Sequence, residues 1–198
     1  STQAKTLFPY TTLFRSLPRS GIAASSSLEI AGLGGDEKFM SSVNKFATYY
    51  GMQDLIDYDL ILRYKAQFKY LAMNSSDEKY SYGEKYYMGG VRTIRGYESN
   101  SLSPKLNGTN ILIGGNTMFV NSIEASFPLI ERMKMRGAIF FDYGMIGDDS
   151  LDIKRGGTGV ALEWISPLGP IGLIFSQPVM DEAGDKKASF EFTIGQKF

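Results

Sequence analysis

The feature that most constrains this chain is an alternation of apolar and polar residues that recurs from residue 21 to the end. A period of two is typical of β-strands whose two faces meet different surroundings. We therefore expect an all-β, antiparallel fold with about eight strands, each of about 10 to 13 residues where the pattern is complete. They cover residues 21–33, 38–50, 58–70, 116–127, 134–143, 156–165, 171–179 and 187–198.

The third of these segments shows the pattern most clearly. Leu62, Tyr64 and Phe68 fall on one face, and Arg63 and Lys65 fall on the other. In a soluble sandwich the apolar face packs on a second sheet, whereas in a membrane barrel it meets lipid and the polar face lines the lumen. Strand length, charged polar faces, and Tyr and Phe near strand ends favour a transmembrane barrel. The pattern alone leaves the sandwich open.

The composition argues against several classes of function. Lys and Arg number 21 and Asp and Glu number 21, so no excess of positive charge favours nucleic acid. The chain has no cysteine and no histidine, which removes the usual zinc ligands and the histidine-dependent catalytic triads. No apolar run is long enough for a transmembrane helix. We expect no catalytic residue, no metal site and no cofactor.

The longest interruption of the alternation is a loop over about residues 71–115. Its central part, residues 87–105, reads YMGGVRTIRGYESNSLSPK. Glycine permits tight backbone, and arginine offers a planar fork that can bind carboxylates. A solvated loop arginine and an arginine anchored inside the protein are both open on these residues. The candidate motif residues are Gly89, Gly90, Ile94, Arg95, Gly96 and Tyr97.

This motif loop resembles the sixth extracellular loop of the Omp85 family, whose VRGF or VRGY motif folds back into a transmembrane β-barrel. Ile94 stands where the family usually has valine, and it preserves the shape. Gly-Gly-Asn at residues 114–116, WISPLGP at 164–170 and FEFTIGQKF at 190–198 are further matches in the same order. The resemblance covers about residues 17–198 and implies a location in the bacterial outer membrane, in contact with its lipid bilayer.

The resemblance also implies that the chain is part of a larger barrel. The family's barrel has sixteen strands, and the motif loop joins the eleventh and twelfth. Three predicted strands precede the loop here and five follow, which matches strands nine to sixteen. An eight-stranded lumen is filled by its own side chains and has no room for such a loop. We expect the first eight strands and the periplasmic POTRA domains to lie outside this chain, which opens without a signal peptide.

The first residues stand apart from this pattern. Residues 6–16 read TLFPYTTLFRS, which looks like the translation of a sequencing adapter. We expect residues 1–16 to form no domain and to have no packed role. An ordinary strand rich in Phe and Thr is the alternative.

Two acidic residues are candidate partners of Arg95. Glu124 and Asp142 lie on the polar faces of the strands that follow the loop, where the family carries acidic partners for the motif arginine. The resemblance therefore implies that Arg95 anchors the loop to the lumen wall through charge-assisted hydrogen bonds.

The last strand resembles the C-terminal signal of outer-membrane proteins, and the family implies that it forms one side of a lateral gate. The alternation predicts that Glu191, Thr193 and Lys197 face the lumen. Gly195 is either a kink or a small residue that relieves crowding. The residues expected to face lipid are Phe190, Phe192, Ile194 and Phe198.

The resemblance implies an assembly factor that inserts unfolded outer-membrane proteins without nucleotide or cofactor. Accessory lipoproteins would bind mainly through the POTRA region. Two other family functions remain as alternatives, a translocation and assembly module and a two-partner secretion pore, although WISPLGP and FEFTIGQKF favour the assembly factor. A passive porin would not need the motif loop, and an outer-membrane enzyme would usually need a histidine base.

Overall fold

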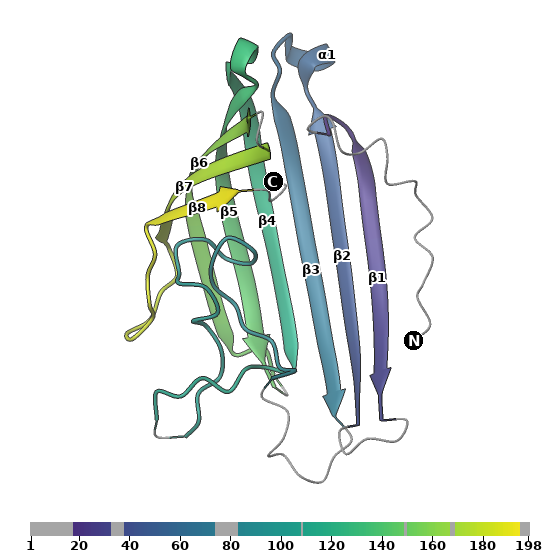
Figure 1. The fold of residues 1–198 in the computed structure, drawn as a ribbon, viewed down its shortest axis with the longest axis vertical. Coiled ribbons are helices and arrows are strands. Elements are labelled where there is room, and N and C mark those ends of the chain that lie inside the picture. The colour runs from purple at the N-terminus through teal and green to yellow at the C-terminus, as the bar shows by residue number, and fades with distance from the viewer. Residues whose placement is uncertain are drawn as a thin grey trace.

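The computed structural model describes residues 18–32, 38–73, 83–107, 109–148, 150–166 and 169–194. Within these ranges the strands form one antiparallel sheet in which each strand pairs with the next along the chain (Figure 1). The predicted all-β antiparallel fold is confirmed. Residues 1–16 lie outside the described ranges. The strands are β1 (Gly21–Ala31), β2 (Phe39–Gly51), β3 (Ile61–Met73), β4 (Thr117–Ile130), β5 (Met135–Gly147), β6 (Ile153–Ser166), β7 (Gly169–Pro178) and β8 (Phe190–Ile194).

Two short helices lie at one end of the sheet, opposite the end where the motif loop leaves β3. They are α1 (Gln53–Ile56), between β2 and β3, and the 3-10 helix η1 (Glu131–Met133), between β4 and β5 (Figure 1). In the part of the chain that the structure describes, no helix has the length and apolar character needed to cross a membrane.

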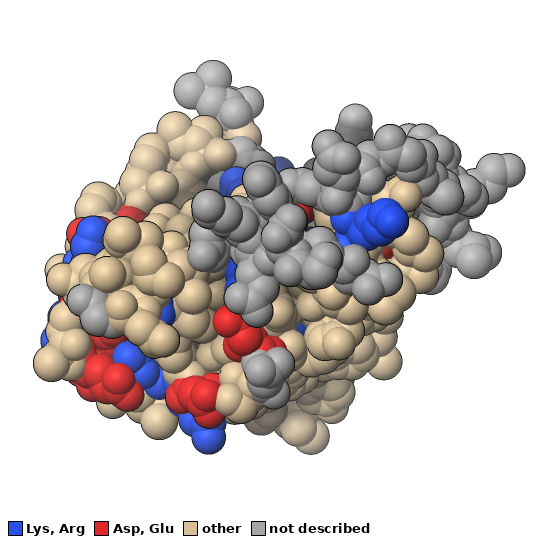
Figure 2. Space-filling model, turned by 90° about the horizontal axis from the view of Figure 1, so that it is seen from below, with Lys and Arg blue, Asp and Glu red and all other residues tan. Residues whose placement is uncertain are grey.

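The two faces of the sheet differ as the alternation predicts. Ile123 and Ile139 are each 56% exposed on the outer face, whereas Glu124 and Asp142 are 4% and 1% exposed on the inner face. Seen from below, the outer wall carries little charge, and charged side chains gather toward the loop and the interior (Figure 2). The sheet is open in the described chain, with β1 and β8 at its edges.

The strand limits differ from prediction in two informative places. The predicted strand ends at residue 127, directly before Pro128, but β4 continues to Ile130, with a register shift between Pro128 and Ile130. The pairing of β3 with β4 ends at Ser126, so Pro128 pairs only with β5 and its missing N–H costs no hydrogen bond to β3. The last strand is shorter than expected, because β8 begins at Phe190 rather than near residue 187.

The motif loop lies inside the curve of the sheet, mainly over β4 to β8 (Figure 1). Its residue Tyr86 also reaches β2 and β3, where its hydroxyl lies 2.8 Å from Oγ of Ser41 and its ring lies under Nζ of Lys69. This arrangement brings residues 83–107 against strands that come much later in the sequence. It defines the candidate site.

Candidate functional site

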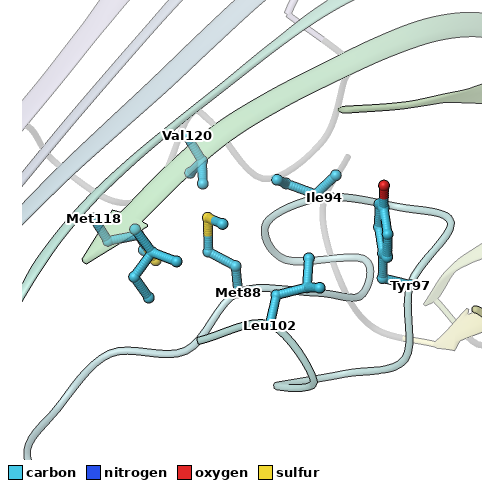
Figure 3. Packing of buried hydrophobic residues seen from close by; sticks show 7 residues of the cluster. Met88, Ile94, Tyr97, Leu102, Met118 and Val120 are labelled. Atoms are coloured by element: carbon cyan, nitrogen blue, oxygen red, sulfur yellow. The ribbon is translucent and has the colours of Figure 1, made fainter. Parts of the chain in front are cut away.

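The motif loop packs on the sheet through an apolar cluster on the inner face. Met88, Ile94 and Tyr97 of the loop are fully buried (Figure 3). The sequence pattern missed this cluster, because we expected the inner face to be polar. Met118 and Val120, which depart from a polar inner face, were the available signal. The full cluster contains Met88, Ile94, Tyr97, Leu102, Met118, Val120 and Ile146.

Two glycines allow the backbone of the loop to approach the sheet closely. A Cβ on Gly157 of β6 would lie 1.9 Å from the carbonyl oxygen of Arg95. Gly96 has a φ of +99°, and a Cβ there would lie 2.9 Å from the carbonyl carbon of Gln177. No side chain fits at either contact, so the sequence requires glycine on both sides of this interface.

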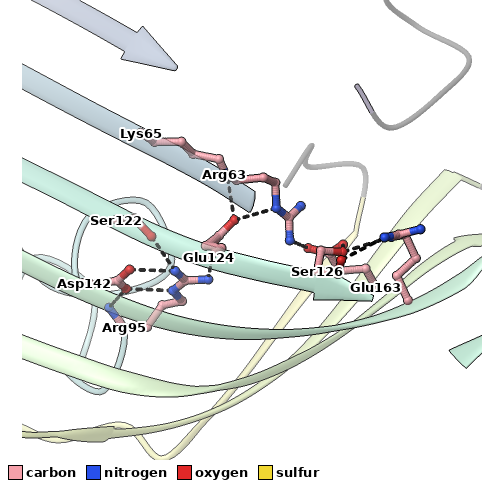
Figure 4. A network of polar contacts seen from close by, with 9 residues as sticks. Arg63, Lys65, Arg95, Ser122, Glu124, Ser126, Asp142 and Glu163 are labelled. Carbon is pink, nitrogen blue, oxygen red and sulfur yellow. Dashed lines mark hydrogen bonds and ion pairs between the residues drawn. The ribbon is translucent and has the colours of Figure 1, made fainter. Parts of the chain in front are cut away.

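Arg95 is held by the inner faces of β4 and β5 (Figure 4). Its Nε and Nη2 bind the two oxygens of Asp142 at 2.7 and 2.6 Å, and its backbone N–H donates to the same carboxylate at 3.0 Å. Nη1 lies 2.8 Å from Oε1 of Glu124, and Nη2 donates to Oγ of Ser122 at 2.9 Å. The guanidinium carbon stacks 3.4 Å from the ring centroid of Phe140. Charge-assisted and bidentate contacts of this kind fix both the position and the orientation of the guanidinium group.

Arg95 stays charged in this setting. Burial alone would lower its pKa, but the hydrogen bonds and the charge of Asp142, together with Glu124, raise its pKa above the usual range. The structure thus brings together the three residues that the sequence singled out as an arginine and its acidic partners.

The charged cluster extends along the wall beyond these three residues. Oε2 of Glu124 lies 3.0 Å from Nε of Arg63 and 3.2 Å from Nζ of Lys65. Arg63 in turn pairs with Glu163 of β6 at 2.5 Å. The alternation in the sequence places Arg63 on a polar face, but it does not pair this residue with Glu163. Their partnership depends on curvature, which brings β3 near β6.

A second polar contact fixes the end of the motif. The Tyr97 hydroxyl lies 3.1 Å from the carbonyl oxygens of Gly156 and Met180, to which it donates. Burial, followed by the charge of Asp185, raises the pKa of Tyr97 to about 12. The hydroxyl therefore remains a donor across the physiological range.

The residues expected in the terminal strand fall on two faces. Phe190, Phe192 and Ile194 are more than half exposed on the outer face, and Thr193 is buried on the inner face with Glu191 half-buried beside it. Gly195, Lys197 and Phe198 lie outside the described residues. Gly89 and Gly90 lie at the start of the loop, where the backbone turns with positive φ.

The chain is similar to proteins that carry one name. It is 26% identical to the outer membrane protein assembly factor BamA of Nitratidesulfovibrio vulgaris, over 95% of this chain and 24% of that protein. It is 29% identical to BamA of Neisseria meningitidis serogroup B, over 58% of this chain and 19% of that protein. The chain thus spans about a quarter or less of the length of these relatives.

The fold is similar to that of a solved barrel. The crystal structure of BamA from Haemophilus ducreyi lacking POTRA domains 1–3 matches with a TM-score of 0.79 and 21% sequence identity, over 96% of this chain and 40% of that chain. The model of the Omp85 superfamily domain matches residues 11–198. Because this match extends over nearly the whole sequence, the chain belongs to the Omp85 superfamily.

Proposed function

We propose that this chain is the C-terminal half of the barrel of an outer-membrane protein assembly factor. In the complete protein it would insert unfolded β-barrel proteins into the outer membrane. Support comes from membership of the Omp85 superfamily and from relatives named as assembly factors. The activity belongs to a longer protein, since the relatives are about four times as long as this chain. Accessory lipoproteins, bound mainly through the POTRA region, are part of the proposal.

The location follows from the family. Omp85 proteins of this kind are outer-membrane proteins of Gram-negative bacteria, and the BamA relatives belong to that group. The exposed apolar side chains on the outer face suit contact with hydrocarbon, and the charged inner face suits a lumen.

The observation that carries the proposed mechanism is the terminal strand. Within the described range β8 spans five residues and pairs only with β7, whereas β4 to β6 each span 13 or 14 residues and pair on both sides. An unpaired strand edge offers a row of backbone donors and acceptors to an incoming strand. We infer that β8 forms one side of a lateral gate and that its outer edge templates the client strand.

This mechanism needs no catalytic residue and no nucleotide. The client gains free energy by burying apolar surface in the bilayer and by completing its own backbone hydrogen bonds. The barrel lowers the barrier by supplying a temporary partner for strands that cannot stay unpaired in lipid. We therefore propose that the protein is not an enzyme.

A reversible lock at the gate tests this mechanism. The sequence has no cysteine, so an engineered pair is the sole disulfide in this part of the protein. Ile194→Cys, combined with a cysteine on the first strand of the complete barrel, should stop insertion of a client barrel into proteoliposomes. Reduction of the disulfide should restore it.

The matched control locks a seam that the mechanism keeps closed. Leu173 and Phe192 are register partners across β7 and β8, so Leu173→Cys with Phe192→Cys cross-links the strands without closing the gate. This variant should insert clients at the wild-type rate. Full activity of the completely cross-linked gate variant would rule out lateral opening at β8.

A further inference from the structure

The motif loop contacts the last part of the chain as well as the charged cluster. The N–H of Ala188 donates to the carbonyl of Gly96 at 3.1 Å, and the N–H of Glu98 donates to the carbonyl of Lys186 at 3.0 Å. Tyr97 forms an antiparallel bridge with Lys187 between these two bonds. Three successive loop residues, Gly96 to Glu98, therefore pair, like a short strand, with the segment that leads into β8.

One contact reaches β8 itself. The backbone N–H of Val91 donates to Oε1 of Glu191 at 2.8 Å. The other carboxylate oxygen of Glu191 is buried and has no hydrogen-bond partner among the described residues, and the same holds for Oγ1 of Thr193. A half-buried carboxylate with one buried and unpaired oxygen is costly to keep. This contact is therefore weaker and easier to release than the fully paired Arg95.

Among the described residues, β8 is joined to the sheet only by its pairing with β7. Five register pairs join the described part of β8 to β7. The connection that precedes β8 is also tied to β6, where Arg155 binds Asp185 at 2.6 Å and Glu182 at 3.0 Å. The loop contacts are thus a substantial share of what attaches residues 186–191 to the rest of the molecule.

The same loop residues connect the two regions. The N–H of Arg95 binds Asp142 of β5, and the carbonyl of the next residue, Gly96, accepts from Ala188. Gly96 also lies so close to the backbone of Gln177 and Pro178 that a Cβ on it would not fit, so the loop has little room to move there. A shift of the loop at Arg95 must therefore move the partner of Ala188 as well.

We propose that the motif loop is a latch on the terminal strand and that Glu191 is the positioning residue through which it holds β8. This latch adds a means of control to the proposed lateral gate. It rests on that proposed function only in the claim that release of β8 opens the gate. When the loop leaves the charged cluster, β8 loses Val91 and the strand-like pairing at residues 186–188. The gate strand is then held by its pairing with β7 and, through the residues that precede it, by the ion pairs of Arg155.

Amide hydrogen exchange in the protein from its complete gene, reconstituted in phospholipid nanodiscs, tests the latch directly. Glu191→Ala removes the acceptor, so exchange at Val91 and in residues 186–194 should rise about tenfold, as the loss of a hydrogen bond to a charged group implies. Glu191→Gln keeps an acceptor without a buried charge, so exchange should match or fall below wild type. Glu29→Ala is the control, because Glu29 is an exposed carboxylate on β1.

The second experiment asks whether a change at Arg95 loosens β8 through the loop. Arg95→Lys keeps a cation but loses the bidentate fork, so exchange in residues 186–194 should rise severalfold although Arg95 makes no hydrogen bond or ion pair with these residues. Unchanged mobility of the folded barrel on a gel identifies variants that still fold. The latch is wrong if the exchange rate at Val91 rises less than about threefold in Glu191→Ala. It is also wrong if Glu191→Gln exchanges as fast as Glu191→Ala.

The two proposals fail in different ways. The exchange measurement needs no client and no insertion activity, so an intact latch can be found in a protein that is not an assembly factor. If the gate lock stops insertion while Glu191→Ala leaves exchange unchanged, the assembly function stands and the latch is wrong.

Discussion

At the scale of single residues, Arg95 joins the motif loop to the inner face of the sheet. Its guanidinium contacts Asp142, Glu124, Ser122 and the face of Phe140, and it is 7% exposed. Burial of an ion pair contributes little net stability when all partners are present, but removal of one partner leaves the others charged and unpaired. We therefore expect the cluster to specify one position of the loop more than it adds to the overall free energy of folding.

Substitution of Arg95 should show this asymmetry. Arg95→Ala leaves Glu124 and Asp142 with fewer cations, and we expect it to lower the free energy of unfolding by about 3 to 5 kcal/mol and to make the loop sensitive to protease. Urea unfolding in vesicles and limited proteolysis measure the two effects. Arg92→Ala is the control, because Arg92 is an exposed arginine of the same loop. Equal effects of the two substitutions would show that the cluster does not hold the loop.

At the scale of elements, the motif loop and β6 approach each other so closely that their backbones are nearly in contact. β6 carries glycine where the loop crosses it, and the carbonyl of Arg95 occupies the space that a Cβ on Gly157 would need. The neighbour Gly156 differs, because a Cβ there would meet side-chain atoms of Val179 and Met180 at 3.2 Å or more. Adjacent glycines on one strand thus have different tolerance for a methyl group.

Alanine substitutions at these two positions should separate the effects. Gly157→Ala forces the loop backbone away from β6, and we expect a loss of about 1 to 3 kcal/mol in the free energy of unfolding together with faster amide exchange in residues 88–97. Gly156→Ala should cost less and leave exchange in the loop unchanged, since flexible side-chain ends can move aside. Slower exchange in the Gly157→Ala loop would contradict the packing.

At the scale of the whole molecule, the sheet divides its surroundings in two. Apolar side chains such as Ile139 and Phe141 are exposed on the outer face, which would be an aggregation hazard in water but suits a bilayer. The inner face buries its charges in pairs and covers part of its wall with the motif loop. The open edges of the described sheet could not remain unpaired in lipid, which fits a strand arrangement completed by further chain.

A lysine scan distinguishes lipid contact from simple exposure. Ile139→Lys places a charge near the middle of β5 on the outer face, and we expect it to cost about 2 to 4 kcal/mol in vesicles. Ile111 is similarly exposed, at 60% against 56% for Ile139, but it lies in the loop, so Ile111→Lys should change stability by less than about 0.5 kcal/mol. Equal costs in reversible unfolding experiments would mean that the outer face of β5 does not meet hydrocarbon.

The sequence by itself determined the strands and their faces. Alternation in a strand is a local property, because successive side chains must point to opposite sides, so Leu62 and Arg63 could be assigned to faces without knowledge of any partner. The motif residues and the acidic candidates Glu124 and Asp142 were also identifiable from sequence, through the family's pattern. The extension of β4 beyond Pro128 was not, because it depends on which neighbouring strand still pairs there.

Only the tertiary structure decided which residues meet across the concave face. The pairing of Arg63 with Glu163, the stacking of Arg95 on Phe140 and the bond from Val91 to Glu191 join residues that are far apart in sequence or on separate elements. Such contacts depend on how strongly the sheet curves and how deeply the loop enters, and both follow from the sum of many packing interactions. A period of two records which side of a strand a residue faces, but it carries no information about what stands opposite across the lumen.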